Sequence, residues 1–397
     1  MLKIVIDVTP IDAKPSGVGL YTLNLIKALS KLENKESFKL GLAYQFRLKN
    51  WLKIKLKLST KEFPQSIEIL KNNCDFYEIS LPVKFSNIAI EYFPEFFPLY
   101  IENMIEGNNI FHGTNYTVYP FKGLTKIINI YDLAFIKYPS YIDSVVQNYA
   151  KIVKKCLTWT DIIITISESS KKDIINYLNF PEEKIFVTPL ASRYNINYLD
   201  NIDQEKEIDN INYDFSKPYL LFVSTIEPRK NITGIIKAFN YLKEKYKIQH
   251  QLVLIGRKGW KFEPIFQEIE TSPYNSEIHH LNYLNDKHLA IFYSKAEVFV
   301  YPSFYEGFGL PVLEAMTLGT PVVTSNTSSI PEVAGDGAIL INPDEILELA
   351  EGILKVISDQ KIKQDLIIKG RKQSQNFSWE KTAKETLKAY QQLTINN

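Results

Sequence analysis

Short runs of β-branched and aromatic residues alternate with amphipathic segments along most of this chain. In the first half, residues 3–8, 126–131, 161–166 and 185–188 have the composition of buried strands, and residues 18–32 and 167–178 have helical spacing. Alternation of this kind is typical of βαβ units, in which helices cover both faces of a parallel sheet. The pattern therefore predicts an α/β domain in the first half.

The same alternation restarts in the second half after a polar interval. Apolar runs occur at 219–225, 251–256, 297–303 and 320–325, and a helical pattern follows each of them. The interval at 193–217 is rich in Asn and Asp, which is typical of a linker. We therefore expect an α/β protein with two doubly wound, Rossmann-like domains, 1–192 and 218–376, that face each other across a cleft. Residues 377–397 should form a closing amphipathic helix.

Charge and composition disfavour several classes of protein. Lys and Arg number 46 and Asp and Glu number 45, so the net charge of +1 creates no global field that would attract nucleic acid. The two cysteines, Cys74 and Cys156, match neither a disulfide framework nor a zinc site, which fits a reducing cytosol. The N-terminus has the pattern of a strand and not of a secretory signal, and no uncharged apolar run is long enough to span a bilayer. We expect a cytoplasmic protein that is soluble or peripheral to the membrane.

In open α/β sheets ligands bind beyond the carboxyl ends of the strands, so the loops there carry the candidate functional residues. The loop at 227–231 has the sequence "EPRKN", with Arg229 and Lys230 just before a helix that Asn231 can cap. Cations are unfavourable at the positive end of a helix unless an anion binds there. The loop is therefore a candidate phosphate site, and a solvated loop with two surface cations is the alternative.

A second candidate loop is the "SGVG" sequence at 16–19. Gly17 and Gly19 would allow backbone N–H groups to approach a phosphate at the start of the next helix. A turn without a ligand is the alternative. The third glycine of a dinucleotide-binding fingerprint is missing, which disfavours a nicotinamide or flavin enzyme.

The third candidate loop is "YEGFGLPVLEAMTLGTPVV" at 305–323. Backbone N–H groups of residues 308–310 precede a helix that Gly319 can end, with Glu306 before the turn and Glu314 in the expected first helical turn. Carboxylates accept hydrogen bonds from sugar hydroxyls, so these loops and acids together could hold a diphosphate and its sugars. As alternatives, Glu314 would only complement the helix dipole and Glu306 would be a surface acid.

These motifs together resemble glycosyltransferase family 4, and within it the mannosyltransferases. The combination of "EPRKN" with the Glu-x7-Glu block is the specific part of the resemblance, and "SGVGLYTLNL", "FHGTNY", "YDLAF", "SESSKKD" and "FSWEKTAKE" extend it over nearly the whole chain. The resemblance implies a GT-B fold and a retaining transferase that uses a nucleotide-sugar donor.

The resemblance also implies a role for each candidate residue. Arg229 and Lys230 would bind the donor diphosphate and assist the leaving group, and Glu306 would hold the transferred sugar. Asp132 would act on the acceptor side, and these four are the expected catalytic residues. The expected substrate-binding residues are Gly17 and Gly19 at the diphosphate, His112 and Tyr131 on the sugar and acceptor side, Tyr283 and Leu284 at the base, Phe308, Gly309 and Leu310 at the sugar, and Glu314 at the ribose.

Three of these assignments have alternatives or departures. His112 could be a buried histidine with its partners in the protein, and Asp132 could be a loop cap. Many relatives have a histidine where this chain has Tyr131, and a phenol cannot act as a base near neutral pH as imidazole can. The histidine base of those relatives is therefore not expected at position 131 of this chain.

The expected chemistry needs no metal. No Asp-x-Asp triplet occurs in the sequence, and Arg229, Lys230 and helix N-termini can neutralise the phosphates, so we predict a metal-independent enzyme without a cofactor. The resemblance of "EPRKN" points to GDP-mannose as the donor, with a UDP-sugar as the alternative, and to a glycan or lipid-linked glycan as the acceptor. A non-catalytic nucleotide-sugar- or glycan-binding protein on the same fold is the rival interpretation.

A basic segment at 46–63, "FRLKNWLKIKLKLSTKEF", has a single opposing acid, Glu62. Lysines alternate with apolar residues at 53–58, which favours an edge strand protected by lysines, although a helical face fits as well. The alternative is a basic amphipathic patch from Arg47 to Lys61 for an anionic membrane surface or a lipid pyrophosphate.

Overall fold

The computed structural model describes residues 1–397 except 13–16, 34–35, 73, 96–100, 140–143 and 396–397. The chain divides into two compact units. Unit 1 comprises Met1–Ile136, Ser144–Leu190 and Trp379–Asn397, and unit 2 comprises Lys137–Asp143 and Ala191–Ser378. Each unit has its own sheet and its own apolar core.

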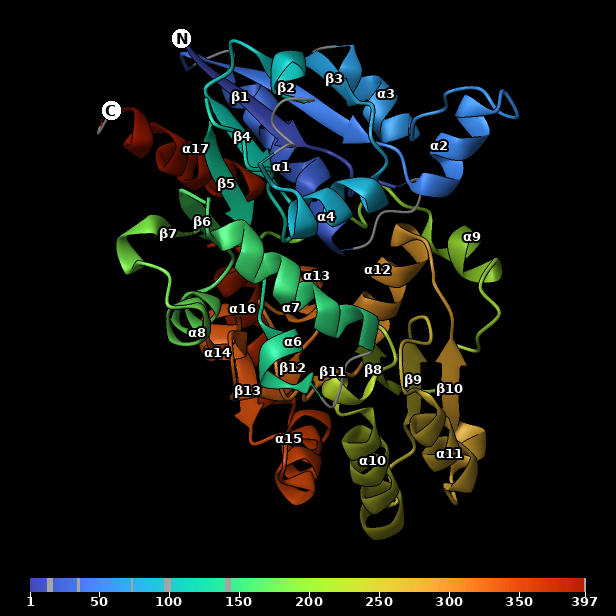
Figure 1. The fold of residues 1–397 in the computed structure, drawn as a ribbon. Coiled ribbons are helices and arrows are strands. Elements are labelled where there is room, and N and C mark those ends of the chain that lie inside the picture. The colour runs from blue at the N-terminus through green and yellow to red at the C-terminus, as the bar shows by residue number, and fades with distance from the viewer. Residues whose placement is uncertain (13–16, 34–35, 73, 96–100, 140–143, 396–397) are drawn as a thin grey trace. The chain divides into compact units, whose positions relative to one another are not determined.

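Unit 1 is built around a seven-stranded sheet in the order β3-β2-β1-β4-β5-β6-β7 (Figure 1). The strands are β1 Leu2–Asp7, β2 Phe38–Gln45, β3 Asp75–Ile79, β4 Ile110–Gly113, β5 Thr125–Asn129, β6 Ile162–Thr165 and β7 Ile185–Val187. Neighbouring strands pair in parallel, with Ile4 of β1 opposite both Leu40 of β2 and Ile110 of β4. The strand order reverses between β1 and β4, which is where ligands bind in doubly wound sheets.

Helices cover this sheet and close the chain. They are α1 Gly17–Glu33, α2 Leu48–Lys55, α3 Gln65–Lys71, α4 Val83–Tyr92, α6 Ala134–Lys137, α7 Ser144–Leu157, α8 Glu168–Leu178 and α17 Trp379–Ile395, with 3-10 turns at Glu102–Ile105 and Glu182–Lys184. Helix α17 packs against α1 and buries Ala383, Leu387 and Tyr390. The predicted amphipathic helix at the C-terminus is therefore present, and it belongs to unit 1.

Unit 2 has a six-stranded sheet in the order β10-β9-β8-β11-β12-β13. Its strands are β8 Tyr219–Val223, β9 Gln251–Ile255, β10 Ile278–Leu281, β11 Val298–Tyr301, β12 Val322–Ser325 and β13 Ala338–Ile341. Its helices are α9 Gln204–Asp209, α10 Ile232–Tyr246, α11 Glu263–Thr271, α12 Asp286–Lys295, α13 Leu310–Leu318, α14 Ile330–Ala334, α15 Ile346–Ser358 and α16 Gln360–Ser374, with 3-10 turns at Pro228–Lys230, Asn275–Glu277 and Gly335–Gly337. The predicted α/β class with two doubly wound domains is confirmed.

The sequence pattern located some elements and missed others. The predicted strands at 3–8, 126–131, 161–166 and 185–188 correspond to β1, β5, β6 and β7. No predicted strand corresponds to β2, β3 or β4. The expected linker at 193–217 forms part of unit 2 and contains the short helix α9.

Local sequence signals explain several helix ends. The Ser167 side chain accepts a hydrogen bond from the Ser170 N–H at the start of α8, and Asn231 accepts one from the Gly234 N–H at the start of α10. Gly319 ends α13 with a φ of 82°, a left-handed conformation that glycine adopts without strain. The caps expected at Asn231 and Gly319 are confirmed.

The interpretation of the basic segment as an edge strand is wrong. Residues 48–55 form helix α2, whose half-buried residues Leu48, Trp51 and Ile54 recur every three residues along one face. The indole Nε1 of Trp51 donates a hydrogen bond to the Ser80 carbonyl at 2.7 Å, which anchors that face to the unit. Packing of this apolar face outweighs the period-two pattern of the lysines.

Two chain-wide expectations concern membrane spans and thiols. In the part of the chain that the structure describes, no helix combines the length and the apolar character needed to cross a membrane. Cys74 and Cys156 are both free, and Cys156 is buried, where burial raises the pKa of its thiol to about 12.

Candidate active site

The candidate site of unit 2 lies at the carboxyl edge of its sheet, where the loops after two neighbouring strands meet. Because β8 pairs with β11, the loop after β8 lies beside the loop after β11. The first loop carries Arg229 and Lys230, and the second carries Glu306. These side chains come into contact although 76 positions separate Lys230 from Glu306.

Glu306 is buried, and the fold fixes its carboxylate from several sides. Its Oε1 accepts hydrogen bonds from Lys230 Nζ at 2.5 Å, from Ser303 Oγ at 2.7 Å and from Tyr301 Oη at 2.9 Å. Its backbone N–H donates to Ser328 Oγ at 2.9 Å. The alternative of a surface loop acid is therefore wrong for Glu306.

A second acid, Glu227, which the sequence analysis did not single out, holds Arg229. Arg229 Nη2 lies 2.7 Å from Glu227 Oε1, and its Nη1 lies 3.4 Å from Glu306 Oε2. The same Nη1 donates to the Tyr305 carbonyl at 2.7 Å. Glu227, Arg229, Lys230 and Glu306, here named the charge cluster, thus combine two positive and two negative groups in a largely buried setting. The loop is not a solvated one.

Burial and charge act in opposite directions on the ionisation of this cluster. Burial favours the neutral form of Glu306, but the Lys230 ammonium and the Arg229 guanidinium outweigh burial and lower the pKa of Glu306 to about 2. Burial and the adjacent Arg229 lower the pKa of Lys230, while Glu306 opposes that shift. An anionic ligand that reached the cluster would compete with the two carboxylates for the two cations.

The start of α13 supplies backbone donors a few residues beyond Glu306. Among the described residues, none accepts a hydrogen bond from the N–H groups of Phe308, Gly309 or Leu310. Gly309 has a φ of 106°, and a Cβ at this position would lie 2.6 Å from Ile330 Cδ1, so glycine is required here. The donors point along the axis of a helix N-terminus, which favours anions and electron-rich oxygens. Their contact with a sugar stays a prediction.

Glu314 lies in the second turn of α13, not in the first turn as expected. Its carboxylate is buried and accepts hydrogen bonds from Arg193 Nε at 2.7 Å and from Tyr293 Oη at 3.2 Å. Arg193 also pairs with Asp286 at the start of α12, at 3.0 Å. A role confined to the helix dipole does not explain this network, since the dipole acts mainly on the first turn.

Arg193 was not among the predicted site residues, because it lies within the expected linker at 193–217. The residue lies 121 positions before its partner Glu314, and no local spacing connects the two. It is the only arginine in the Asn- and Asp-rich stretch at 193–217, and that was the available signal.

Unit 1 carries five further predicted site residues, Gly17, Gly19, His112, Tyr131 and Asp132. Gly17 is exposed at the start of α1 and Gly19 is buried in its first turn, while Ser16 of the same motif lies outside the described residues. The Asp132 Oδ1 accepts a hydrogen bond from the Ala134 N–H at 3.0 Å, which matches the loop-cap alternative. Tyr131 is buried, and burial raises the pKa of its phenol well above 10.

His112 is fully buried and has partners in the protein on both ring nitrogens. Nδ1 lies 2.7 Å from Tyr390 Oη on α17, and Nε2 is hydrogen-bonded to Asn129 Oδ1 on β5. This geometry matches the alternative of a buried, satisfied histidine. A contact of His112 with the sugar stays a prediction, and it would require one of these bonds to open.

Acid should destabilise unit 1 through His112. Burial lowers the pKa of this histidine from 6.5 to about 4, so between these values the unfolded chain binds a proton that the folded one does not. The free energy of unfolding should therefore not depend on the ionisation of His112 above pH 6.5, and it should fall by about 3 kcal/mol as the pH drops to about 4. Chemical denaturation of wild type and His112→Asn across this range measures the difference. Parallel stability profiles of the two proteins would contradict the assignment.

Tyr283 and Leu284 follow β10 at the same carboxyl edge of the sheet of unit 2. Tyr283 is exposed and Leu284 is half-buried, and Asn285 beside them caps α12 by accepting a hydrogen bond from the His288 N–H. Their backbone is accessible near the loop, and recognition of a base there stays a prediction. Among the described residues, no group of three or more His, Cys, Asp or Glu side chains is arranged to hold a metal ion.

Comparison with known proteins agrees with this arrangement. Residues 203–373, which include most of unit 2, match the family model described as glycosyl transferases group 1. O-antigen chain mannosyltransferase B from Escherichia coli is 29% identical over 99% of this chain and 100% of its own length. The protein is a GT-B glycosyltransferase that resembles family 4.

Further relatives fit the same description. Serotype-specific mannosyltransferase WbdA from Escherichia coli is 28% identical over 59% of this chain, and the match spans 29% of that protein. Among solved structures, sucrose-phosphate synthase from Thermosynechococcus elongatus superposes with a TM-score of 0.73 over 100% of both chains, at 18% identity. At that identity the structural likeness supports the fold alone.

Proposed function

We propose that this glycosyltransferase acts in the cytoplasm and transfers mannose from GDP-mannose, with retention of configuration, to a glycan or lipid-linked glycan. The observation that carries the proposal is the charge cluster followed by the N-terminus of α13. Two relatives from Escherichia coli are mannosyltransferases, which supports mannose as the sugar. The free thiols of Cys74 and Cys156 support a reducing compartment.

The charge cluster suits the departure of a nucleoside diphosphate. As the bond between the sugar C1 and the phosphate oxygen breaks, negative charge develops on that oxygen. The Arg229 guanidinium and the Lys230 ammonium, held in position by Glu227 and Glu306, can turn toward this charge. In a buried setting such pre-positioned cations stabilise developing charge more strongly than they would in water.

Retention requires the acceptor hydroxyl to approach C1 from the face that the diphosphate leaves. In this course a bond forms between C1 and the acceptor oxygen, and the departing phosphate oxygen takes the proton of that hydroxyl. The buried Tyr131 phenol, with its raised pKa, would be a poor base for this proton. The leaving group itself therefore supplies the base in this proposal.

We also propose that the reaction needs no divalent metal. Two cationic side chains and the N-terminus of α13 can together neutralise the charge of the diphosphate. The Glu306 carboxylate then becomes available to hydrogen-bond the hydroxyls of the transferred sugar, since each carboxylate oxygen accepts well.

A donor panel with product analysis tests the proposal. The protein is incubated with GDP-mannose, UDP-glucose or UDP-N-acetylglucosamine and a panel of mannose-containing acceptors, with and without a metal chelator. We expect transfer from GDP-mannose that survives chelation, and NMR of the product should show the anomeric configuration of the donor. Transfer from a UDP-sugar and not from GDP-mannose would contradict the proposed donor. A product with inverted anomeric configuration would contradict the proposed retaining mechanism. Donor binding without any transfer would favour the non-catalytic rival.

Glu314→Gln should weaken donor binding while changing turnover little. The carboxylate is expected to accept hydrogen bonds from the ribose hydroxyls, and loss of a hydrogen bond to a charged group costs about 1.5–3 kcal/mol, or roughly 10- to 100-fold in Kd. Isothermal titration with GDP-mannose measures this change. The control is Glu297→Gln, which removes the partner of Lys363 at the opposite end of β11. Unchanged donor affinity in Glu314→Gln would remove the ribose contact.

A further inference from the structure

Exposed apolar side chains gather on one part of unit 1. Of the sixteen large apolar side chains that are exposed among the described residues, eight lie within residues 52–93: Leu52, Leu56, Leu58, Ile69, Phe85, Ile88, Tyr92 and Phe93. That stretch is about a tenth of the chain, so the concentration is far above an even distribution. Clusters of this kind mark binding surfaces, whereas scattered exposed apolar residues are normal.

Helix α2 presents one side of this surface. None of its residues is fully buried, although Leu48, Trp51 and Ile54 are half-buried against the unit. Leu52 is 43% exposed and Leu56, just beyond the helix, is 65% exposed. Figure 1 shows α2 at the periphery of unit 1, and α4 is a helix of the unit that it contacts. The outer face of α2 is thus amphipathic and uncovered.

Helix α4 continues the same surface. Phe85, Ile88 and Tyr92 follow one another at positions i, i+3 and i+7, which places them on one stripe of the helix, and all three are exposed. The Phe85 ring packs edge-on against Trp51 of α2, with centroids 6.3 Å apart. The apolar stripe of α4 is therefore continuous with α2.

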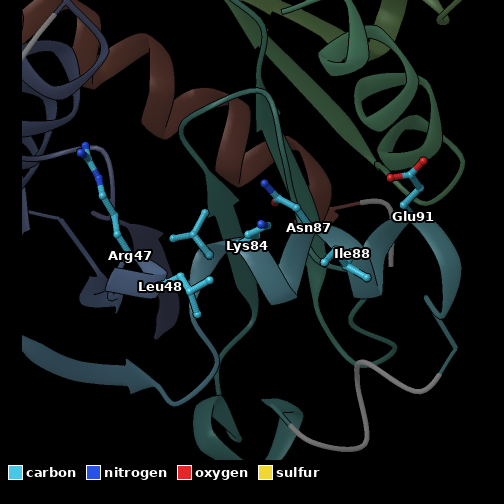
Figure 2. A pocket seen from close by; sticks show the side chains of 7 residues that line it. Arg47, Leu48, Lys84, Asn87, Ile88 and Glu91 are labelled. Carbon is cyan, nitrogen blue, oxygen red and sulfur yellow. The ribbon is translucent and has the colours of Figure 1, made fainter. Parts of the chain in front are cut away.

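A groove of about 410 Å³ lies between the two helices. Its lining consists of Arg47, Leu48, Val83, Lys84, Asn87, Ile88 and Glu91. Figure 2 shows the labelled side chains in a row, with Arg47 at one end and Glu91 at the other. The groove is thus lined by three apolar side chains, two cations, one amide and one acid. Arg47 forms a salt bridge with Asp12 at 2.8 Å. Both side chains are exposed, so the pair contributes little to stability and Arg47 can exchange Asp12 for another anion.

Positive charge surrounds the apolar residues. Exposed cations of α2 and its flanks are Arg47, Lys49, Lys53, Lys55 and Lys57, and Lys84 lies on α4. Lysines beside exposed Leu and aromatic side chains are the pattern of helices that lie in the plane of a membrane interface. A protein partner with an apolar face would not require this many cations, whereas an anionic bilayer attracts each of them.

We propose that the surface formed by α2, α4 and the groove between them, here named the α2–α4 surface, docks on a bilayer that contains anionic phospholipids. Leu52, Leu56 and Tyr92 enter the interface between head groups and acyl chains, and the cations contact phosphates. Arg47 and Lys84 bring a lipid phosphate to the groove. This inference rests on the proposed function, in which the acceptor is a lipid-linked glycan. Docking of the α2–α4 surface would hold the enzyme at the bilayer in which such an acceptor is embedded.

Vesicle co-sedimentation tests the proposal directly. The full-length protein is mixed with vesicles of phosphatidylcholine alone, or of equal parts phosphatidylcholine and phosphatidylglycerol, at low and high salt. We expect pelleting only with the anionic vesicles and a steep loss at high salt, where the screening length falls to a few ångströms. Excess inorganic phosphate at constant ionic strength should not release the protein, since the bilayer and not a free phosphate is the proposed ligand.

Two variants and one control separate the contributions. Replacing Lys49, Lys53 and Lys84 with Ser should weaken binding about a hundredfold, because each cation near an anionic surface contributes roughly fivefold. Leu56→Ser with Tyr92→Ser should weaken binding as well, and both residues are exposed enough to leave the fold intact. The control replaces Lys172, Lys237 and Lys372, three exposed lysines on other helices, with Ser and removes the same charge. Its binding should stay close to wild type.

The outcomes distinguish this inference from the proposed function. Equal pelleting with neutral and anionic vesicles, or equal loss in the control variant, would overturn the docking surface. Release by inorganic phosphate would assign the groove to a soluble phosphate instead. Concentration-dependent dimerisation in sedimentation velocity that the Leu56→Ser and Tyr92→Ser changes abolish would assign the surface to a second copy of this chain. In each case transfer to a water-soluble acceptor still reports on the proposed function.

Discussion

Lys230→Ala is expected to reduce the rate of sugar transfer by at least about two orders of magnitude. The ammonium is buried beside Glu306 and would stabilise charge on the leaving diphosphate, and loss of one such group costs about 3–4 kcal/mol in the transition state. Arg229→Ala should have an effect of similar size. Single-turnover rates at saturating GDP-mannose measure the chemical step without the influence of donor affinity.

A matched control is available in the same unit. Lys243 is also a buried lysine paired with a glutamate, Glu277, at 2.5 Å. It lies on α10 about 20 Å from Lys230, from the rise of the helix. Lys230→Ala and Lys243→Ala should both lower the melting temperature, because each removes the lysine partner of a glutamate carboxylate. Lys243→Ala should keep its transfer rate, and near-normal rates in both Lys230→Ala and Arg229→Ala would remove the proposed phosphate site.

The sequence predicted the positions of these groups but not their contacts with each other. Loops after strands end at one edge of a parallel sheet, so Arg229, Lys230 and Glu306 were expected near a common ligand. Which loops become neighbours depends on strand order, and β8 lies next to β11 because of pairing that no local pattern encodes. The cations were therefore predicted to pair with a ligand, whereas in the structure Glu227 and Glu306 neutralise them.

Burial was the second property that local patterns could not supply. His112 and Tyr131 were expected to face a substrate, yet both are buried, and His112 has partners at Tyr390 and Asn129. Tyr390 belongs to the last helix and lies 278 positions away. A contact over that distance in the sequence follows only from the complete fold of unit 1.

Periodicity failed where two patterns overlapped. In residues 46–63 the lysines follow a period of two, and the apolar residues fit both a strand and a helix. The helix is favoured because Leu48, Trp51 and Ile54 pack against the unit and the Trp51 indole finds an acceptor at Ser80. Long, strongly periodic elements such as α1 and β1 carried no such ambiguity.

Glu306→Gln should lower turnover by about two orders of magnitude and leave donor affinity within a few-fold of wild type. The carboxylate holds Lys230 in place and is expected to accept hydrogen bonds from the transferred sugar, whereas an amide of the same shape has one acceptor oxygen and no charge. The donor diphosphate can still pair with Arg229 and Lys230, which lose a competing carboxylate in this variant. The effect should therefore fall on the rate and not on Kd, the opposite of Glu314→Gln.

Rate and affinity together decide between the two acids. Single-turnover kinetics give the chemical step, titration with GDP-mannose gives Kd, and Glu277→Gln serves as the control because it removes the partner of a buried lysine away from the site. Protonation of Glu306 is not expected to affect these measurements near neutral pH, since its pKa of about 2 keeps the carboxylate ionised there. A Glu306→Gln variant with weak donor binding and a normal rate, beside a Glu314→Gln variant with the reverse, would show that the two roles are exchanged. Normal rate and affinity in Glu306→Gln would remove Glu306 from the reaction and leave it as the group that stabilises Lys230.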